Sequence, residues 1–94
     1  MQVKNISKRL RKVAGFVPQD AKILDVGSDH AYLPIYLIQQ GRTSSAIASE
    51  VVEGPYQSAV TNVADNQMSD KIDVRLANGL AAFDMGDQID DIVI

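Results

Sequence analysis

The stretch ILDVGSDHAYLPIY, residues 23–36, decides the fold because it passes from a strand pattern to a helical pattern across one glycine. Residues 22–26 form a short β-branched and apolar run that Gly27 stops, which is typical of a buried strand. Beyond the glycine, apolar residues recur at helical spacing, and Pro34 suits the first turn of a helix. We therefore predict a strand over residues 22–26 and a helix over residues 31–40.

The segments outward from this stretch repeat the alternation. Before it, an apolar stripe predicts an amphipathic helix that ends near Gly15 and Pro18. The stripe consists of Ile6, Leu10, Val13 and Val17. After it, we expect strands at residues 45–49, 72–76 and 90–94, a helix that opens at residues 53–55, and a short helical stretch near residues 80–83. The helix that opens at residues 53–55 is expected to use one face made of Tyr56, Val60, Val63 and Gln67.

Strands that alternate with helices require right-handed crossovers and a parallel sheet covered on both faces. The predicted fold class is therefore α/β, a doubly wound Rossmann-like sheet of about four strands with an additional N-terminal helix. The last predicted strand, residues 90–94, is apolar at its end and has nothing after it to cover it. We therefore expect residues 1–94 to be the N-terminal part of a longer domain.

Composition excludes several classes of protein. The 94 residues are 46% hydrophobic and 22% charged, which fits one globular domain. Since the chain lacks an apolar run of roughly 20 residues and an apolar leader, we expect a soluble cytoplasmic protein without membrane contact. With no cysteine and only one histidine, His30, thiolate and multi-histidine metal sites are excluded, and no metal is expected.

The charge is distributed unevenly. The chain has a net charge of -3, but residues 1–13 hold five basic and no acidic residues. The candidate RNA-binding residues in this arm are Lys8, Arg9, Arg11 and Lys12. A basic arm on an acidic body fits contact with RNA phosphates, although a solvated helix face has the same pattern.

Polar residues follow the first strand, at the edge of the sheet where open parallel sheets bind ligands. Gly27 permits a tight turn and close approach of a ligand to the backbone, and Ser28, Asp29 and His30 supply polar groups at the start of the helix. The alternative is an ordinary strand-to-helix turn in which Asp29 caps the helix.

Two further loops fit the same ligand. Glu50, 25 residues after Asp25, ends the second strand, where a carboxylate can accept hydrogen bonds from both hydroxyls of a ribose. Asn78 and Gly79 follow the third strand, where an amide can bind an adenine edge. A plain Asn-Gly turn explains the third loop equally well.

Missing motifs narrow the choice of ligand. The chain has no G-x-x-x-x-G-K-[ST] sequence, and its first loop lacks G-x-G-x-x-G because Asp29 stands where a second glycine would admit a pyrophosphate. An acidic loop instead suits a cofactor that carries an amino group and a positive charge beside a ribose and an adenine. S-adenosylmethionine has this combination.

These residues carry a family resemblance. ILDVG at residues 23–27, together with Glu50, resembles motifs I and II of class I methyltransferases. The narrower strings are SKRL at residues 7–10, GSDHAYLPIY at 27–36, EVVEGP at 50–55 and VRLANGL at 74–80. With them the chain resembles the bacterial TrmK family, tRNA methyltransferases that act on N1 of an adenine in the D-arm region. Its members are longer, and their glycine-rich motif after the fourth strand matches no residue here.

The resemblance implies a class I methyltransferase fold, S-adenosylmethionine as cofactor and tRNA as partner. The cofactor contacts that it implies are Gly27, Ser28, Asp29, Glu50, Val51, Asn78 and Gly79, with Asp25 supporting the first loop. Asn78 stands where many class I enzymes have an acid, so that adenine recognition would depend on a neutral amide.

Few residues are candidates for catalysis. Asp29 and His30 lie at the cofactor loop, but a histidine that only fixes the turn fits equally well. Two roles are open for Tyr32 and Tyr36, stacking on a base and packing of the helix, and packing is favoured. Arg9 fits either tRNA phosphate or the carboxylate of the cofactor.

Two alternatives remain open at this point. A nicotinamide-dinucleotide-binding domain explains the acid after the second strand, but it requires the missing pyrophosphate loop. A non-catalytic fragment explains the final uncovered strand. For this chain by itself we expect little or no methylation of tRNA.

Overall fold

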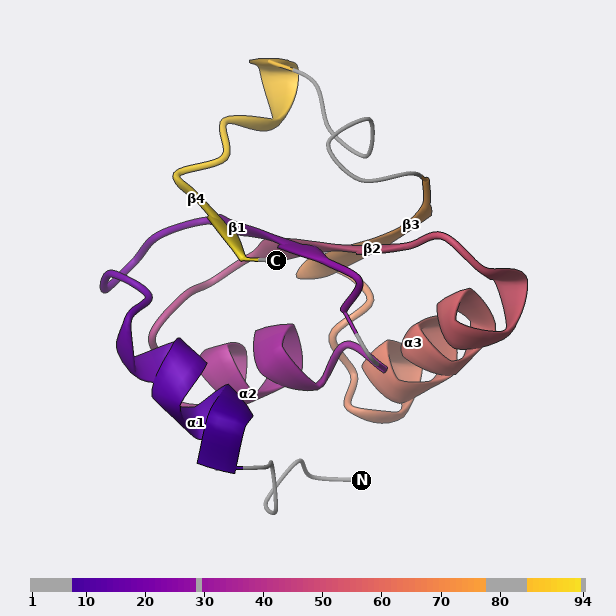
Figure 1. The fold of residues 1–94 in the computed structure, drawn as a ribbon, viewed down its shortest axis with the longest axis horizontal. Coiled ribbons are helices and arrows are strands. Elements are labelled where there is room, and N and C mark those ends of the chain that lie inside the picture. Colours follow the sequence, from indigo (N-terminus) through magenta and orange to yellow (C-terminus); the bar gives the residue numbers. More distant parts are fainter. Residues whose placement is uncertain (1–7, 29, 78–84, 94) are drawn as a thin grey trace.

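The computed structural model describes residues 8–28, 30–77 and 85–93. Helices and strands alternate along the chain (Figure 1). In chain order they are α1 (Lys8–Gly15), β1 (Ile23–Val26), α2 (Tyr32–Gln39), β2 (Ala46–Glu50), α3 (Glu53–Asp65), β3 (Ile72–Leu76), the 3-10 turn η2 (Met85–Asp87) and β4 (Asp91–Val93). The predicted short helix at residues 80–83 lies outside the described residues.

The four strands form one parallel sheet in the order β3-β2-β1-β4. The chain builds outward from β1 to β3 and then crosses back to place β4 on the other side of β1, which is the doubly wound arrangement. Val26 is in register with Ser49, and Glu50 is in register with Leu76. The carboxyl ends of β1, β2 and β3 therefore lie at one edge of the sheet, which we call the carboxyl edge.

The two faces of the sheet are covered differently. Figure 1 shows α1, α2 and α3 on one face, and η2 with the extended chain that leads into β4 on the other. On the helical face, β1 and α2 pack through Ile23, Leu33 and Leu37, all fully buried. On the opposite face, Leu24 and Ile47 pack with the partly buried residues Val26, Ala77 and Ile89. The predicted cover on both faces is thus confirmed by helices on one face only, and the described cover of the second face is a turn and extended chain.

The first helix confirms the predicted amphipathic pattern in part. Val17 is buried after the end of α1, and Val13 packs partly buried against the same core. Ile6 lies outside the described residues, as does the side chain of Leu10. The predicted helix over residues 31–40 is confirmed with slightly narrower bounds, because Ala31 has a left-handed backbone and cannot begin the helix.

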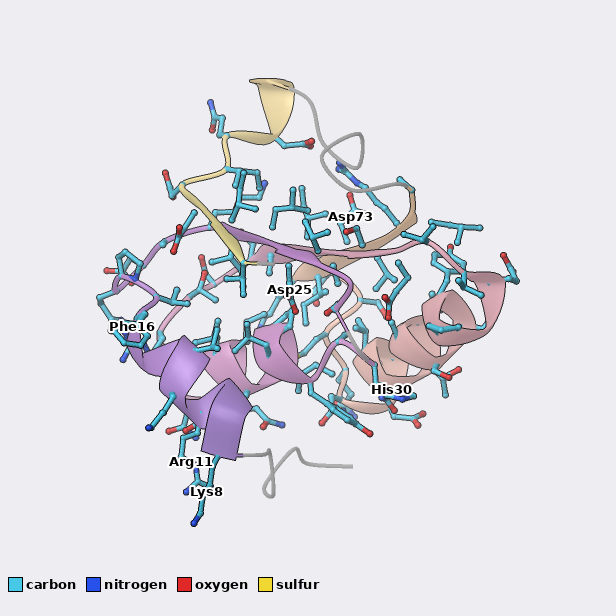
Figure 2. The ribbon with its side chains drawn as sticks, viewed as in Figure 1. Lys8, Arg11, Phe16, Asp25, His30 and Asp73 are labelled. Carbon is cyan, nitrogen blue, oxygen red and sulfur yellow. The ribbon has the colours of Figure 1, made fainter. Side chains whose placement is uncertain are left out.

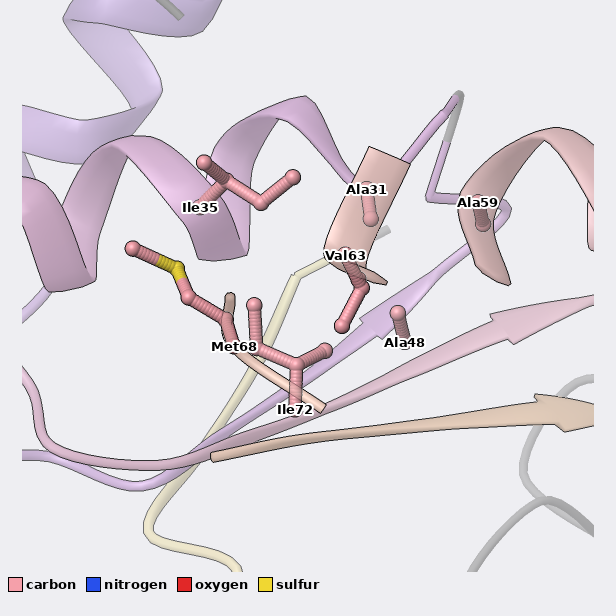
Figure 3. Packing of buried hydrophobic residues seen from close by; sticks show 7 residues of the cluster. All are labelled: Ala31, Ile35, Ala48, Ala59, Val63, Met68 and Ile72. Carbon is pink, nitrogen blue, oxygen red and sulfur yellow. The ribbon is translucent and has the colours of Figure 1, made fainter. Parts of the chain in front are cut away.

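The predicted apolar face of α3 is wrong in two positions. Ala59 and Val63 are the buried residues of this helix, whereas Val60 is 36% exposed. Gln67 lies beyond the helix, is exposed, and has a left-handed backbone with φ 59°. Small Ala59 lets the helix lie close to the sheet, where it packs with Ala48 and Ile72 (Figure 3). Ala59 and Val63 therefore define the buried face of this helix.

Candidate cofactor site

The loop after β1 folds back over the end of β2. Gly27 has φ 66°, a backbone conformation that costs a residue with a side chain but not glycine. The N–H groups of Gly27 and Ser28 both donate to the carbonyl oxygen of Ser49, at 3.0 and 3.1 Å. This arrangement brings the loop and the end of β2 together at the carboxyl edge.

Asp25 supports this loop from below. The Ser28 hydroxyl donates to Asp25 Oδ2 at 2.8 Å, and the two residues are only 3% and 6% exposed. A carboxylate buried in the sheet thus has a hydrogen-bond donor from the loop that it holds, which offsets the cost of its burial. Figure 2 shows Asp25 between the sheet and the helices that cover it.

The second half of the loop contains two left-handed residues in succession. His30 has φ 64° and Ala31 has φ 61°, and α2 begins directly after them at Tyr32. The N-cap position of α2 is Ala31, with no side-chain cap. The His30 ring lies 5.2 Å from the Tyr32 ring, at an angle of 31°. Asp29 lies outside the described residues, so neither its predicted contact nor a capping role is described.

Glu50 is the last residue of β2 and brings a carboxylate to the same edge. It is 5% exposed, and among the residues that the structure describes no group hydrogen-bonds its Oε2 atom. Its backbone carbonyl accepts the Ala77 N–H at 2.9 Å, which extends the ladder between β2 and β3. A buried acceptor without a partner is costly for the folded protein, and such atoms frequently mark the position of a ligand.

The other predicted contacts have mixed positions. Val51 follows Glu50 and is 59% exposed. Asn78 and Gly79 lie outside the described residues. Tyr36 packs partly buried against both core clusters of the helical face, in agreement with a packing role. Tyr32 packs against one of them and contacts His30.

The basic arm lies on α1. Lys8, Arg11 and Lys12 are exposed, and Figure 2 shows Lys8 and Arg11 pointing away from the sheet. The side chain of Arg9 lies outside the described residues. The arm therefore presents cations to solvent on a helix that packs against α2 and not at the carboxyl edge itself.

Asn62 is a site residue that sequence reasoning missed. Its side-chain Nδ2 donates to the carbonyl oxygen of His30 at 3.0 Å. Since 32 residues separate the two partners, no local pattern signals the contact.

Within the described ranges, no three His, Asp or Glu side chains gather as ligands for a metal ion. The helices that the structure describes are also too short or too polar to span a bilayer.

Comparison with known proteins decides the family. The model of the TrmK family, described as tRNA (adenine(22)-N(1))-methyltransferase, matches residues 23–94. The chain belongs to the TrmK family. Its TrmK match includes all four strands of the sheet and every described residue of the carboxyl edge.

Three relatives illustrate the TrmK similarity. The tRNA (adenine(22)-N(1))-methyltransferase of Bacillus subtilis is 42% identical over 82 residues, which are 87% of this chain. The Streptococcus pneumoniae protein Sp1610, assigned as a tRNA (m1A22) methyltransferase and solved with S-adenosyl-L-methionine, is 65% identical over 94% of this chain, with a TM-score of 0.91. TrmK of M. capricolum, solved with S-adenosyl-homocysteine, is 40% identical over 80% of this chain, with a TM-score of 0.76.

The relatives are longer than this chain. It spans 34% of the Bacillus subtilis enzyme, 41% of the Streptococcus pneumoniae chain and 33% of the M. capricolum chain. The shared part comprises the sheet and the loops at its carboxyl edge.

Proposed function

We propose that this protein takes part in S-adenosylmethionine-dependent methylation of N1 of an adenine in tRNA, and that residues 1–94 supply the cofactor-binding part of the enzyme. The observation that carries the proposal is the buried Glu50 carboxylate, which has no described partner on Oε2. It lies at the carboxyl edge of a TrmK-family sheet. That edge is where doubly wound sheets bind nucleosides.

The residues of the edge fit the cofactor. A ribose has two adjacent hydroxyls, and a carboxylate at the end of β2 can accept a hydrogen bond from each. Glu50 Oε2 has no hydrogen-bond partner among the described residues, and burial strengthens any hydrogen bond that it accepts. Gly27 exposes its backbone at the neighbouring loop, so a ligand can approach the main chain closely. Ser28 and Asp25 hold that loop in place.

The transfer itself requires little acid-base chemistry from the chain. When bound, S-adenosylmethionine supplies an electrophilic methyl group on a sulfonium. Adenine N1 has a lone pair and no proton, so the new N–C bond forms as the S–C bond breaks, without prior removal of a proton. We therefore propose that residues of this chain bind the cofactor and the adenine, orient them toward each other and exclude water. Alignment of the two reactants is then the main gain in rate. His30, in the turn before α2, is a candidate contact to the target adenine.

The basic arm supports a tRNA substrate. Lys8, Arg11 and Lys12 present three exposed cations on one helix, whereas the chain as a whole is acidic. Such a local cluster suits phosphate contacts that orient an RNA without reading its sequence. A tRNA substrate would place the protein in the cytoplasm.

Calorimetric titration of this chain with S-adenosylmethionine, and separately with NAD, tests the cofactor. We expect saturable binding of S-adenosylmethionine and none of NAD. Glu50→Gln should weaken this binding about tenfold or more, because the NH₂ group of glutamine cannot accept a hydrogen bond from the second ribose hydroxyl. The matched control is Glu53→Gln. Glu53 is exposed three residues further on and accepts a hydrogen bond from Gln57 Nε2.

Three outcomes oppose the proposal. Saturable NAD binding without S-adenosylmethionine binding would favour a nicotinamide-binding domain. Equal losses in Glu50→Gln and Glu53→Gln would remove Glu50 from the site. Binding of neither cofactor would mean that these 94 residues do not form the site, which would refute the assignment of the cofactor-binding part to them.

A further inference from the structure

The turn between the cofactor loop and α2 is conformationally costly. His30 and Ala31 are both left-handed, with φ 64° and 61°, and neither is glycine. Each such residue is disfavoured by contact between its Cβ atom and its own backbone. Two in succession persist only when other contacts hold them.

A chain of side-chain amides on α3 supplies such contacts. Asn62 Nδ2 donates to the His30 carbonyl oxygen at 3.0 Å, at the beginning of α2. Asn66 directly follows α3; its Nδ2 donates to the backbone carbonyl oxygen of Asn62 at 2.8 Å, and its Oδ1 accepts from Gln39 Nε2 at 3.2 Å, at the end of α2. The chain thus links α3 to both ends of α2, and its first amide reaches the costly turn.

The position of Asn62 relates this turn to the site. Figure 2 shows His30 beside α3, and only residue 29 separates His30 from Ser28, whose hydroxyl holds Asp25. Ala31 is fully buried and packs with Ala59 and Val63 of the same helix. The far end of the cofactor loop is therefore held to α3 by an apolar contact at Ala31 and by a hydrogen bond at His30.

We propose that Asn62 is a positioning residue for the cofactor: its amide holds the left-handed turn at His30–Ala31 and so helps to determine the direction in which Gly27 and Ser28 present their backbone to S-adenosylmethionine. This inference rests on the proposed function. The carbonyl of His30 needs a donor, and the amide of asparagine provides one without adding charge. Asn62 is partly exposed in a groove of ≈ 320 Å³ with His30, Tyr32, Gln57, Ser58 and Thr61. Water can therefore replace the lost donor in a variant but cannot direct the turn.

The first test compares Asn62→Ala with Asn66→Ala in this chain. We expect Asn62→Ala to weaken S-adenosylmethionine binding about tenfold in calorimetry, while the melting temperature falls by less than about 5 °C. Asn66→Ala removes the hydrogen bonds of the Asn66 side chain, one of them to Gln39 at the other end of α2. It should lower the melting temperature similarly, with less than about a twofold change in affinity. Equal affinity losses would indicate a purely structural role for both.

A rescue experiment isolates the turn. Ala31→Gly supplies a residue that adopts positive φ without steric cost, and Ala31 is too buried to touch a ligand. In the Ala31→Gly background, the further change Asn62→Ala should reduce affinity by less than about threefold, since one of the two left-handed residues no longer carries a steric cost and the turn depends less on the amide. The same tenfold loss in both backgrounds would overturn the inference.

The two proposals fail in different ways. If the unaltered chain binds no S-adenosylmethionine, the proposed function is wrong for this chain, and the role of Asn62 toward that cofactor fails with it. If the unaltered chain binds and Asn62→Ala binds equally well, only the positioning role is refuted.

Discussion

Arg75 on β3 forms a two-armed ion pair with Asp87 in η2, with Nη1–Oδ2 at 2.8 Å and Nη2–Oδ1 at 2.9 Å. The pair joins the edge strand of the sheet to the connection that covers its second face (Figure 1). Hydrogen bonds to Asp87 and then to Asp73 raise the pKa of the Arg75 guanidinium above its ordinary value. Because a raised pKa stabilises the fold at every pH below the ordinary arginine value, this contribution is undiminished at neutral and moderately alkaline pH.

Asp87→Asn should destabilise the chain by about 1 kcal/mol, because it removes the bidentate partner of a partly buried arginine. For a domain of this size, we expect the melting temperature to fall by about 4–8 °C, equally at pH 7 and pH 9. Asp73→Asn is the control, because Asp73 is 56% exposed and lies on the same strand as Arg75. Its effect should be under about 0.5 kcal/mol. A larger loss in Asp73→Asn would reverse the assigned importance of the two carboxylates.

Gly27→Ala and Gly41→Ala separate strain from function. Both glycines have positive φ, 66° and 70°, and a Cβ atom at either would meet no atom within 4 Å. Each substitution should therefore destabilise the chain by about 1 kcal/mol through backbone strain alone. Only Gly27→Ala should also weaken S-adenosylmethionine binding, since Gly41 follows α2 at the opposite end of that helix. Chemical denaturation and calorimetry measure the two effects, and equal affinities in both variants would contradict a contact at Gly27.

Glu50→Gln should leave the ligand-free chain as stable as before or more stable. The buried carboxylate has no described partner on Oε2, so the neutral amide relieves the cost of burying a charge. We expect the melting temperature, measured without cofactor, to rise by about 2–5 °C. A fall of the same size would indicate that the carboxylate stabilises the fold and is not held for a ligand.

Neutralising the basic arm should weaken tRNA binding and reduce the salt dependence of the affinity, because fewer counterions are released from the RNA. In the triple variant Lys8→Gln/Arg11→Gln/Lys12→Gln, the slope of log affinity against log salt should fall by about 2–3, since each phosphate contact contributes roughly one unit. Fluorescence anisotropy with an unmodified tRNA transcript, over a series of salt concentrations, measures the slope. Lys71→Gln, an exposed lysine directly before β3, is the control and should change the slope by well under one unit. An unchanged slope in the triple variant would show that the arm does not contact tRNA phosphates.

The elements of the fold follow from local patterns in the sequence. The β-branched run that ends at Gly27 predicts β1, and the Glu-Gly-Pro sequence at residues 53–55 predicts the start of α3. Both depend on neighbouring residues only, through backbone preferences and side-chain period. Once strands and helices alternate, the parallel order and the position of a ligand at the carboxyl edge follow from the handedness of the crossovers. Glu50 and the first loop were therefore accessible from the sequence.

Long-range contacts decided the rest. The sequence assigned Val60 to the buried face of α3, but the structure buries Ala59 because a small residue fits against Ala48 of the sheet. Among the described residues none hydrogen-bonds Glu50 Oε2, and this follows from the packed arrangement of several elements rather than from any pattern along the chain.

The sequence by itself determined the order of elements and the position of the carboxyl edge, because periodicity and turn residues act over a few neighbours. Only the tertiary structure decided that Asn62 holds His30 and that Asp87 holds Arg75. These pairs lie 32 and 12 residues apart, and their geometry exists only after the sheet and its two covers have packed.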